Sequence, residues 1–161
     1  MHIYPEERNR SAGPVHALEL MTRALVGVTM QSLTVLGGQV SLPQFRLLLL
    51  SAGLGRVPSS RLAAELGMTA SSVTRLADRL EASGLLTRGA DPRNRSVVTL
   101  EVTQAGLDLV ARVVERRHEL LAAVLDRMSP AEREEAARTA RLFAGLAADA
   151  AALSVTGPLP L

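Results

Sequence analysis

Residues 58–106 read PSSRLAAELGMTASSVTRLADRLEASGLLTRGADPRNRSVVTLEVTQAG. Two short helical patterns in this stretch meet at Gly67-Met68-Thr69, where a glycine and a threonine able to cap a helix indicate a tight turn. The spacing predicts helices over about 60–66 and 70–83. The second helix keeps its apolar residues on one face, at Val73, Leu76, Ala77 and Leu80.

A β-hairpin is predicted directly after these helices. Residues 85–88 and the β-branched run 97–102 have the composition of strands. The residues between them, 89–95, are rich in turn formers. Thr103 then has the place of an N-cap for another helix. The order is that of a helix-turn-helix followed by a β-hairpin wing.

Long helical patterns flank this stretch on both sides. A helix is expected over about 14–36 that is apolar nearly all round, a pattern that requires cover on two sides. Ser41 and Gln44 have capping-box spacing and predict a helix over 42–52. Further helices are expected over 104–128 and 129–153, and the second of these is rich in alanine.

These elements predict a mainly α fold, an α+β winged helix with about six helices and a two-stranded wing. Helices from both ends of the chain would form a dimerisation region, because they carry more apolar surface than a small winged helix can cover. We expect an N-terminal arm and dimerisation helix over 1–40, a DNA-binding region over 41–102, dimerisation helices over 103–155 and a tail over 156–161.

Bulk composition excludes several classes of protein. The 161 residues suffice for one domain with a core, and 47% of them are hydrophobic. The absence of cysteine excludes disulfides and thiol chemistry. We expect a cytoplasmic protein, because the sequence shows neither a secretory signal nor an apolar run long enough for a membrane span.

Arginine is unevenly distributed along the chain. The net charge is only +2, and all 18 basic residues are arginine, for which GC-rich codon usage is a sufficient explanation. Residues 56–96, however, hold seven arginines against four acidic residues. Most of the excess positive charge therefore lies in the helix-turn-helix and its wing, which indicates a polyanionic partner.

The outward face of the helix over 70–83 predicts contact with DNA. Small hydroxyl residues let a helix sink into the major groove, and hydroxyls at a helix N-terminus bind phosphate oxygens. Arg75 lies one turn in, where it can reach a guanine edge, and Arg79 is better placed for backbone phosphate. The candidate residues on this helix are Ser71, Ser72, Thr74, Arg75 and Arg79.

The predicted wing tip carries Arg93 and Arg95 with Asp91. Turn geometry allows Asp91 to pair with one of these arginines and make the loop rigid, which leaves the other arginine free. A protruding arginine suits the narrow, electronegative minor groove of A·T-rich DNA. Either arginine can fill that place.

The stretches SLPQFRLLLL, SSRLAAELGMTASSVTRLADRLEASGLLTR and DPRNRSVVTLEVTQAG, over about 41–106, resemble the MarR family of winged-helix transcriptional regulators. The resemblance implies a homodimer that binds a pseudo-palindromic operator, usually as a repressor. Its groove-facing positions match 71, 72, 74 and 75, and its usual wing arginine and acid match Arg95 and Asp91. Many members carry a second wing arginine where this chain has Ser96 and a second acid where it has Asn94, so Arg93 is an alternative wing arginine.

The same resemblance implies release of DNA by a small lipophilic or phenolic effector. The candidate effector residues are His16, Leu20, Arg23, Phe45 and Leu49. No pattern indicates a catalytic site, a metal site or a cofactor, so we expect a non-enzyme. The competing hypothesis is a winged helix that serves only as a dimerisation or protein-docking module, which Leu or acidic residues on the outward face would favour.

Overall fold

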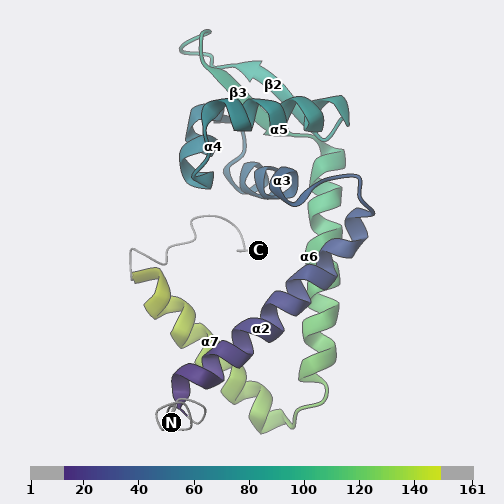
Figure 1. The fold of residues 1–161 in the computed structure, drawn as a ribbon, viewed down its shortest axis with the longest axis vertical. Coiled ribbons are helices and arrows are strands. Elements are labelled where there is room, and N and C mark those ends of the chain that lie inside the picture. The colour runs from purple at the N-terminus through teal and green to yellow at the C-terminus, as the bar shows by residue number, and fades with distance from the viewer. Residues whose placement is uncertain (1–12, 150–161) are drawn as a thin grey trace, which may run out of the picture.

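A computed structural model describes residues 13–149, which form six α-helices and one small sheet (Figure 1). The expected N-terminal arm, up to residue 12, and the tail over 156–161 lie outside the described residues. The helices are α2 (Pro14–Ser32), α3 (Leu42–Leu54), α4 (Ser59–Leu66), α5 (Ala70–Ala82), α6 (Gln104–Leu125) and α7 (Pro130–Asp149). The strands are β1 (Val57–Pro58), β2 (Leu86–Ala90) and β3 (Val98–Val102).

Each predicted helix is present, with ends that differ by up to four residues; the helix predicted over 104–128, for example, ends at Leu125. The first predicted helix ends as an α-helix at Ser32 and continues as a tighter 3₁₀ turn, η1 (Leu33–Leu36), which leads into Gly37 at φ +55°. At the start of α3, the backbone N–H of Ser41 donates to Oε1 of Gln44 at 2.8 Å, as the capping-box spacing predicts. The last expected helix is described as far as Asp149, and its expected end near 153 lies outside that range.

The sheet has three strands in the order β1-β3-β2, and both pairs are antiparallel. The hairpin of β2 and β3 is the predicted wing, with Leu86 opposite Val102 and Ala90 opposite Val98. The wing is two-stranded as predicted, and the sheet has a further strand that the sequence did not predict, because Val57 of β1 pairs with Leu100. Two residues are too short to show the alternation that marks a strand.

The hydrophobic core lies where α3, α4, α5, the sheet and the first half of α6 meet. Its fully buried large side chains include Phe45, Leu48, Leu62, Leu80, Leu100 and Leu109. The predicted inward residues of α5 belong to this core, with Val73, Ala77 and Leu80 buried and Leu76 half-buried. The core therefore holds the helix-turn-helix and the wing as one packed unit.

The other helices extend away from this unit. Figure 1 shows α6 running down from the head of the molecule, with α2 crossing it and α7 returning from its far end. Among the described side chains of α7, from 130 to 147, none is buried. Large apolar side chains are exposed on α2, the second half of α6 and α7: Val15, Leu20, Met21, Leu25, Val26, Met30, Val124, Leu125, Leu142, Phe143 and Leu146.

Candidate nucleic-acid interface

The turn between α4 and α5 fixes which face of α5 points outward. Gly67 ends α4 in the left-handed conformation, at φ +62°, and the backbone N–H of Met68 donates to the Ala63 carbonyl at 2.9 Å. Thr69 then caps α5. Because Val73 and Leu80 are held in the core, the opposite face of α5 is left at the surface, beside the sheet (Figure 1).

Three hydroxyls meet at the N-terminus of α5. Thr69 Oγ1 accepts a hydrogen bond from the Ser72 backbone N–H at 3.2 Å and donates one to Ser72 Oγ at 2.9 Å. Ser71 Oγ lies 3.1 Å from the same Thr69 oxygen. Sequence reasoning assigned only the capping role to Thr69, whereas the structure also makes it the centre around which the two candidate serines are arranged.

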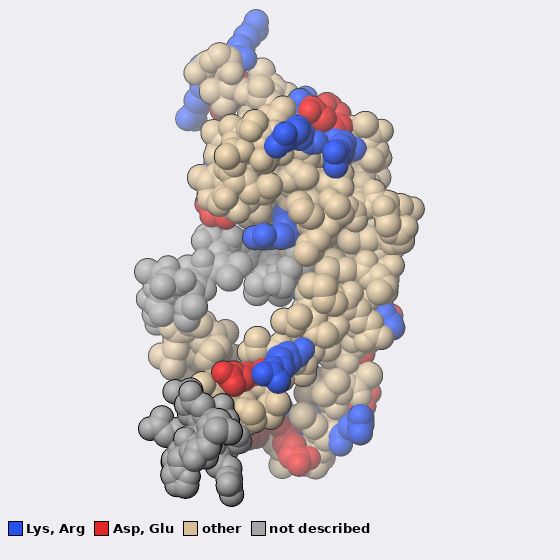
Figure 2. Space-filling model, viewed as in Figure 1, with Lys and Arg blue, Asp and Glu red and all other residues tan. Residues whose placement is uncertain are grey.

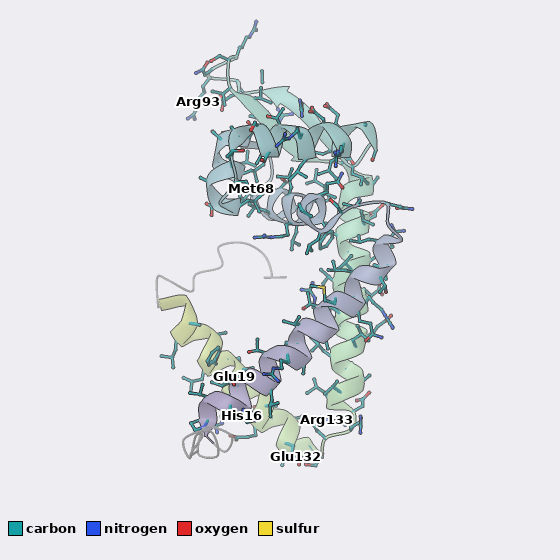
Figure 3. The ribbon with its side chains drawn as sticks, viewed as in Figure 1. His16, Glu19, Met68, Arg93, Glu132 and Arg133 are labelled. Carbon is teal, nitrogen blue, oxygen red and sulfur yellow. The ribbon has the colours of Figure 1, made fainter. Side chains whose placement is uncertain are left out.

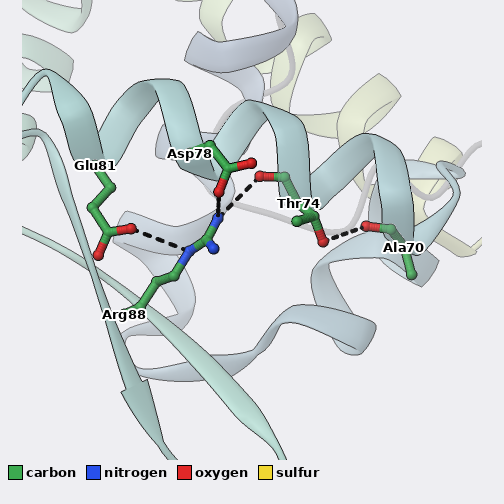
Figure 4. A network of polar contacts seen from close by, with 5 residues as sticks. All are labelled: Ala70, Thr74, Asp78, Glu81 and Arg88. Carbon is green, nitrogen blue, oxygen red and sulfur yellow. Dashed lines mark hydrogen bonds and ion pairs between the residues drawn. The ribbon is translucent and has the colours of Figure 1, made fainter.

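Thr74 differs from the expectation of a hydroxyl free to donate to phosphate. Its Oγ1 donates to the Ala70 carbonyl of its own helix at 2.9 Å (Figure 4). The proton is therefore engaged, and Thr74 keeps only its oxygen lone pairs and its methyl group for contact with a ligand.

Arg75 and Arg79 are both exposed on α5. Arg75 Nη2 lies 3.4 Å from Ser72 Oγ, which places its guanidinium over the hydroxyl cluster. Within residues 13–149, neither arginine forms an ion pair. Both cations are thus available to an anion outside the chain.

The acidic residues of α5 are held by an arginine from the wing (Figure 4). Arg88 of β2 pairs with Asp78 through Nη2 and with Glu81 through Nε, the second pair at 3.3 Å. The same Nη2 donates to the Thr74 carbonyl at 3.0 Å. Sequence reasoning did not single out Arg88. The signal was the strand alternation, which puts Arg88 on the same side as buried Leu86 and therefore toward α5.

The wing loop is braced by its own polar side chains. Asp91 Oδ1 accepts hydrogen bonds from the backbone N–H groups of Arg93 at 2.7 Å and Asn94 at 3.3 Å. Asn94 Oδ1 accepts from the backbone N–H of Ser96 at 3.1 Å and from its hydroxyl at 2.6 Å. The two positions that depart from the usual family pattern, Asn94 and Ser96, are therefore bonded to each other.

The ion pair that turn geometry allows between Asp91 and a wing arginine does not form within the described residues. Asp91 stiffens the loop as predicted, but its partners are backbone amides, which a carboxylate two residues upstream reaches without ordering a long side chain. Arg93 lies at the tip of the molecule in Figure 3, and blue side chains project from that end in Figure 2. Both Arg93 and Arg95 are exposed.

The five candidate effector residues do not come together within one protomer. Phe45 and Leu49 are buried in the core of the winged helix, whereas His16 lies at the far end of α2, where it pairs with Glu19 at 3.7 Å (Figure 3). At 1.5 Å per residue, His16 is about 24 Å along α2 from Ser32, the end near the core. Sequence spacing alone does not tell which end of a long helix meets another element.

Two further properties of residues 13–149 bear on function. They contain no group of three or more His, Asp or Glu side chains arranged to hold a metal ion. None of their helices combines the length and the apolar character that crossing a membrane requires.

Comparison with known families and relatives agrees with this geometry. Residues 40–98 match the MarR family model, a range that spans α3 to the start of β3. An HTH-type transcriptional regulator of Bacillus subtilis strain 168, YfiV, is 30% identical over 95 residues. That match covers 59% of this chain and 59% of the relative's length.

Solved structures share the fold over most of the chain. The crystal structure of RV1404 from Mycobacterium tuberculosis superimposes with a TM-score of 0.73 at 29% identity, covering 87% of this chain and 92% of that one. A MarR family protein from Bacillus stearothermophilus has a TM-score of 0.71 at 25% identity, covering 88% of this chain and 97% of that one. The similarity therefore extends beyond the winged helix to the flanking helices.

Proposed function

We propose that the chain is a winged-helix transcriptional regulator of the MarR family and that it acts as a homodimeric repressor of transcription. The observation that carries the proposal is the set of exposed arginines on α5 and at the wing tip, none of which pairs with an acid within the described chain. YfiV is an HTH-type transcriptional regulator and the Bacillus stearothermophilus protein is a MarR family protein, which agrees with a non-enzymatic role.

In this proposal α5 enters the major groove of double-stranded DNA. Ser71 and Ser72 contact phosphate near the helix N-terminus, where the helix dipole also favours an anion. Arg75 reads a guanine edge, and Arg79 contacts backbone phosphate one turn further along. Thr74, with its proton engaged, offers its methyl group, which suits contact with a thymine methyl.

The wing supplies the second contact in the proposal. The loop held by Asp91 presents Arg93 and Arg95 to the adjacent minor groove, where narrow A·T-rich sequences attract a cation. Both side chains leave the same braced turn, so either can enter the groove while the other contacts phosphate.

We assign DNA binding and dimerisation to different parts of the chain according to which apolar surface is covered. Residues 41–102 bind DNA, and helices from 1–40 and 103–155 hold two copies together through the apolar surface left on α2, α6 and α7. A two-fold dimer would bind a pseudo-palindromic operator with its α5 helices about 34 Å apart. A small lipophilic or phenolic effector that changes this separation would release the DNA. The protein would act in the cytoplasm, where such operators lie.

Titration of the purified protein with genomic DNA fragments over a range of salt concentrations tests the proposal. The wild type should bind with an affinity that falls steeply as salt rises. Arg75→Ala should lower discrimination between operator and other DNA by about 1–3 kcal/mol. Arg93→Ala and Arg95→Ala should weaken binding to the operator and to other DNA by a similar factor.

Arg127→Ala is a matched control, because Arg127 is exposed just after α6, at the other end of the molecule. Its binding should equal that of the wild type. Absence of salt-dependent binding by the wild type would refute DNA binding, and a monomeric mass in solution would refute the dimer.

A further inference from the structure

We infer that Arg88 is a positioning residue that keeps Arg75 available to DNA by holding the acidic residues of α5. The inference rests on the proposed function, because it concerns how the recognition helix meets DNA. It assigns no direct DNA contact to Arg88, whose guanidinium is turned toward α5 in Figure 4.

The contacts of Arg88 reach residues of α5 from Thr74 to Glu81. Its guanidinium reaches the Thr74 carbonyl, the Asp78 carboxylate and the Glu81 carboxylate. The Arg88 side chain is only 29% exposed, whereas those of Asp78 and Glu81 are 55% and 45% exposed. One partly buried cation therefore pairs with two more exposed carboxylates on the surface of α5.

Without Arg88, the two carboxylates would need another partner. Asp78 and Glu81 are three residues apart on one helix, where like charges repel. Asp78 is also three residues from Arg75, the spacing at which opposite charges on a helix attract each other. Loss of Arg88 thus favours a pair between Asp78 and Arg75, which would divert the arginine proposed to read the guanine.

A bare acidic pair would also face the phosphate backbone. DNA-binding affinity depends on the number of phosphates that the protein neutralises, and two uncompensated carboxylates oppose that effect. By pairing with both carboxylates, Arg88 prevents their competition for Arg75 and reduces their repulsion of phosphate. Because β2 continues into the wing loop, the same contacts also fix the position of the wing relative to α5.

The experiment compares binding to two fluorescent duplexes at several salt concentrations: the operator selected from random duplexes by the wild type, and a scrambled duplex of equal length. Arg88→Ala should lose at least about tenfold in affinity for the operator and less for the scrambled duplex. The triple variant R88A/D78N/E81Q should recover most of the lost discrimination, because the neutral amides neither repel phosphate nor compete for Arg75.

Arg116→Ala is the matched control, since Arg116 forms a surface pair with Glu119 on α6 at 2.8 Å, away from α5. It should bind both duplexes as the wild type does. Circular dichroism and a melting curve should show that each variant is folded.

The outcomes separate this inference from the proposed function. If the wild type binds no DNA, the proposed function fails and the inference falls with it. If the wild type binds and Arg88→Ala discriminates equally well, only the inference is overturned. A folded triple variant that discriminates as poorly as Arg88→Ala would likewise overturn it, since Arg88 would then serve the fold alone.

Discussion

Gly106, in the first turn of α6, shows how closely the winged helix and the long helix approach each other. A Cβ at this position would lie 2.3 Å from the Leu85 carbonyl oxygen and 2.5 Å from Val102 Cγ1. Neither neighbour can move freely, because Leu85 O also accepts a hydrogen bond from the Thr103 backbone N–H. Glycine is required here because a side chain has no room. Its backbone conformation is that of an ordinary helix and does not itself require glycine.

Gly106→Ala should therefore destabilise the protein, by about 1–3 kcal/mol, because the new methyl group forces backbone apart. Gly145→Ala is the control, since a Cβ at Gly145 in α7 meets nothing within 4 Å of its own chain. That change should be neutral or stabilising by up to about 1 kcal/mol. Urea unfolding at one protein concentration measures both, and equal effects would contradict the proposed clash.

Arg117 is a buried cation on α6. It is 8% exposed, its Nε has no hydrogen-bond partner among the described atoms, and desolvation lowers the pKa of its guanidinium from the ordinary value. Arg117→Met should raise the free energy of unfolding by about 1 kcal/mol or more, because an unpaired charge leaves the interior. The nearby Arg116→Met should not raise it. A loss of stability in Arg117→Met would contradict the view that the buried charge is uncompensated.

At the scale of elements, the junction between α5 and α6 is a direct link. Gly84 follows the end of α5, and its carbonyl accepts a hydrogen bond from Thr103 Oγ1 at 2.7 Å. Thr103 Oγ1 in turn accepts a hydrogen bond from the Gly106 backbone N–H at 3.2 Å, so Thr103 both caps α6 and holds the end of α5. The end of α5 is thereby tied directly to the start of α6.

Thr103→Val should cost about 1–2 kcal/mol of stability, because the isosteric side chain loses the cap and the bond to Gly84. Hydrogen exchange should also increase at the C-terminal end of α5. Thr103→Ser keeps the hydroxyl and should retain most of the stability. If the valine and serine variants are equally stable, the hydroxyl does not provide this link.

Sequence patterns predicted the helices whose ends and faces depend on residues close together in sequence. The Ser41–Gln44 box and the apolar spacing of α5 depend on residues three or four apart, which are neighbours in any helix. The pairing of Val57 with Leu100 was missed, because it depends on a contact between residues far apart in sequence.

The candidate site shows the same division between local and tertiary information. The exposed face of α5 followed from its apolar spacing, but the partners of its polar groups did not. Arginine side chains and backbone amides are alternative partners for the Asp91 carboxylate, and the turn places the amides of Arg93 and Asn94 within hydrogen-bond distance. Strand alternation puts Arg88 on the side of α5, but its pairing with Asp78 and Glu81 depends on how β2 packs against α5, which spacing alone does not supply.

At the scale of the whole molecule, the apolar surface is divided into a covered part and an uncovered part. The winged helix encloses its own core, while α7 buries none of its described side chains, and Leu142 and Leu146 are 59% and 62% exposed. Apolar side chains on α2 and the second half of α6 add to this surface. In the proposed homodimer a second copy covers these exposed apolar side chains.

Leu146→Glu should therefore separate the proposed dimer, because a charge in an apolar interface is left without water or a partner. Light scattering after gel filtration should show half the wild-type mass. Operator affinity should fall by a factor of about 10²–10⁴, since each monomer then binds one half-site without the benefit of linkage to its twin. Thr139→Glu places the same charge at an exposed polar position of α7 and should remain dimeric. If Leu146→Glu keeps both the mass and the affinity of the wild type, α7 does not belong to the interface, and the spacing of the two α5 helices must be set by α2 and α6 alone.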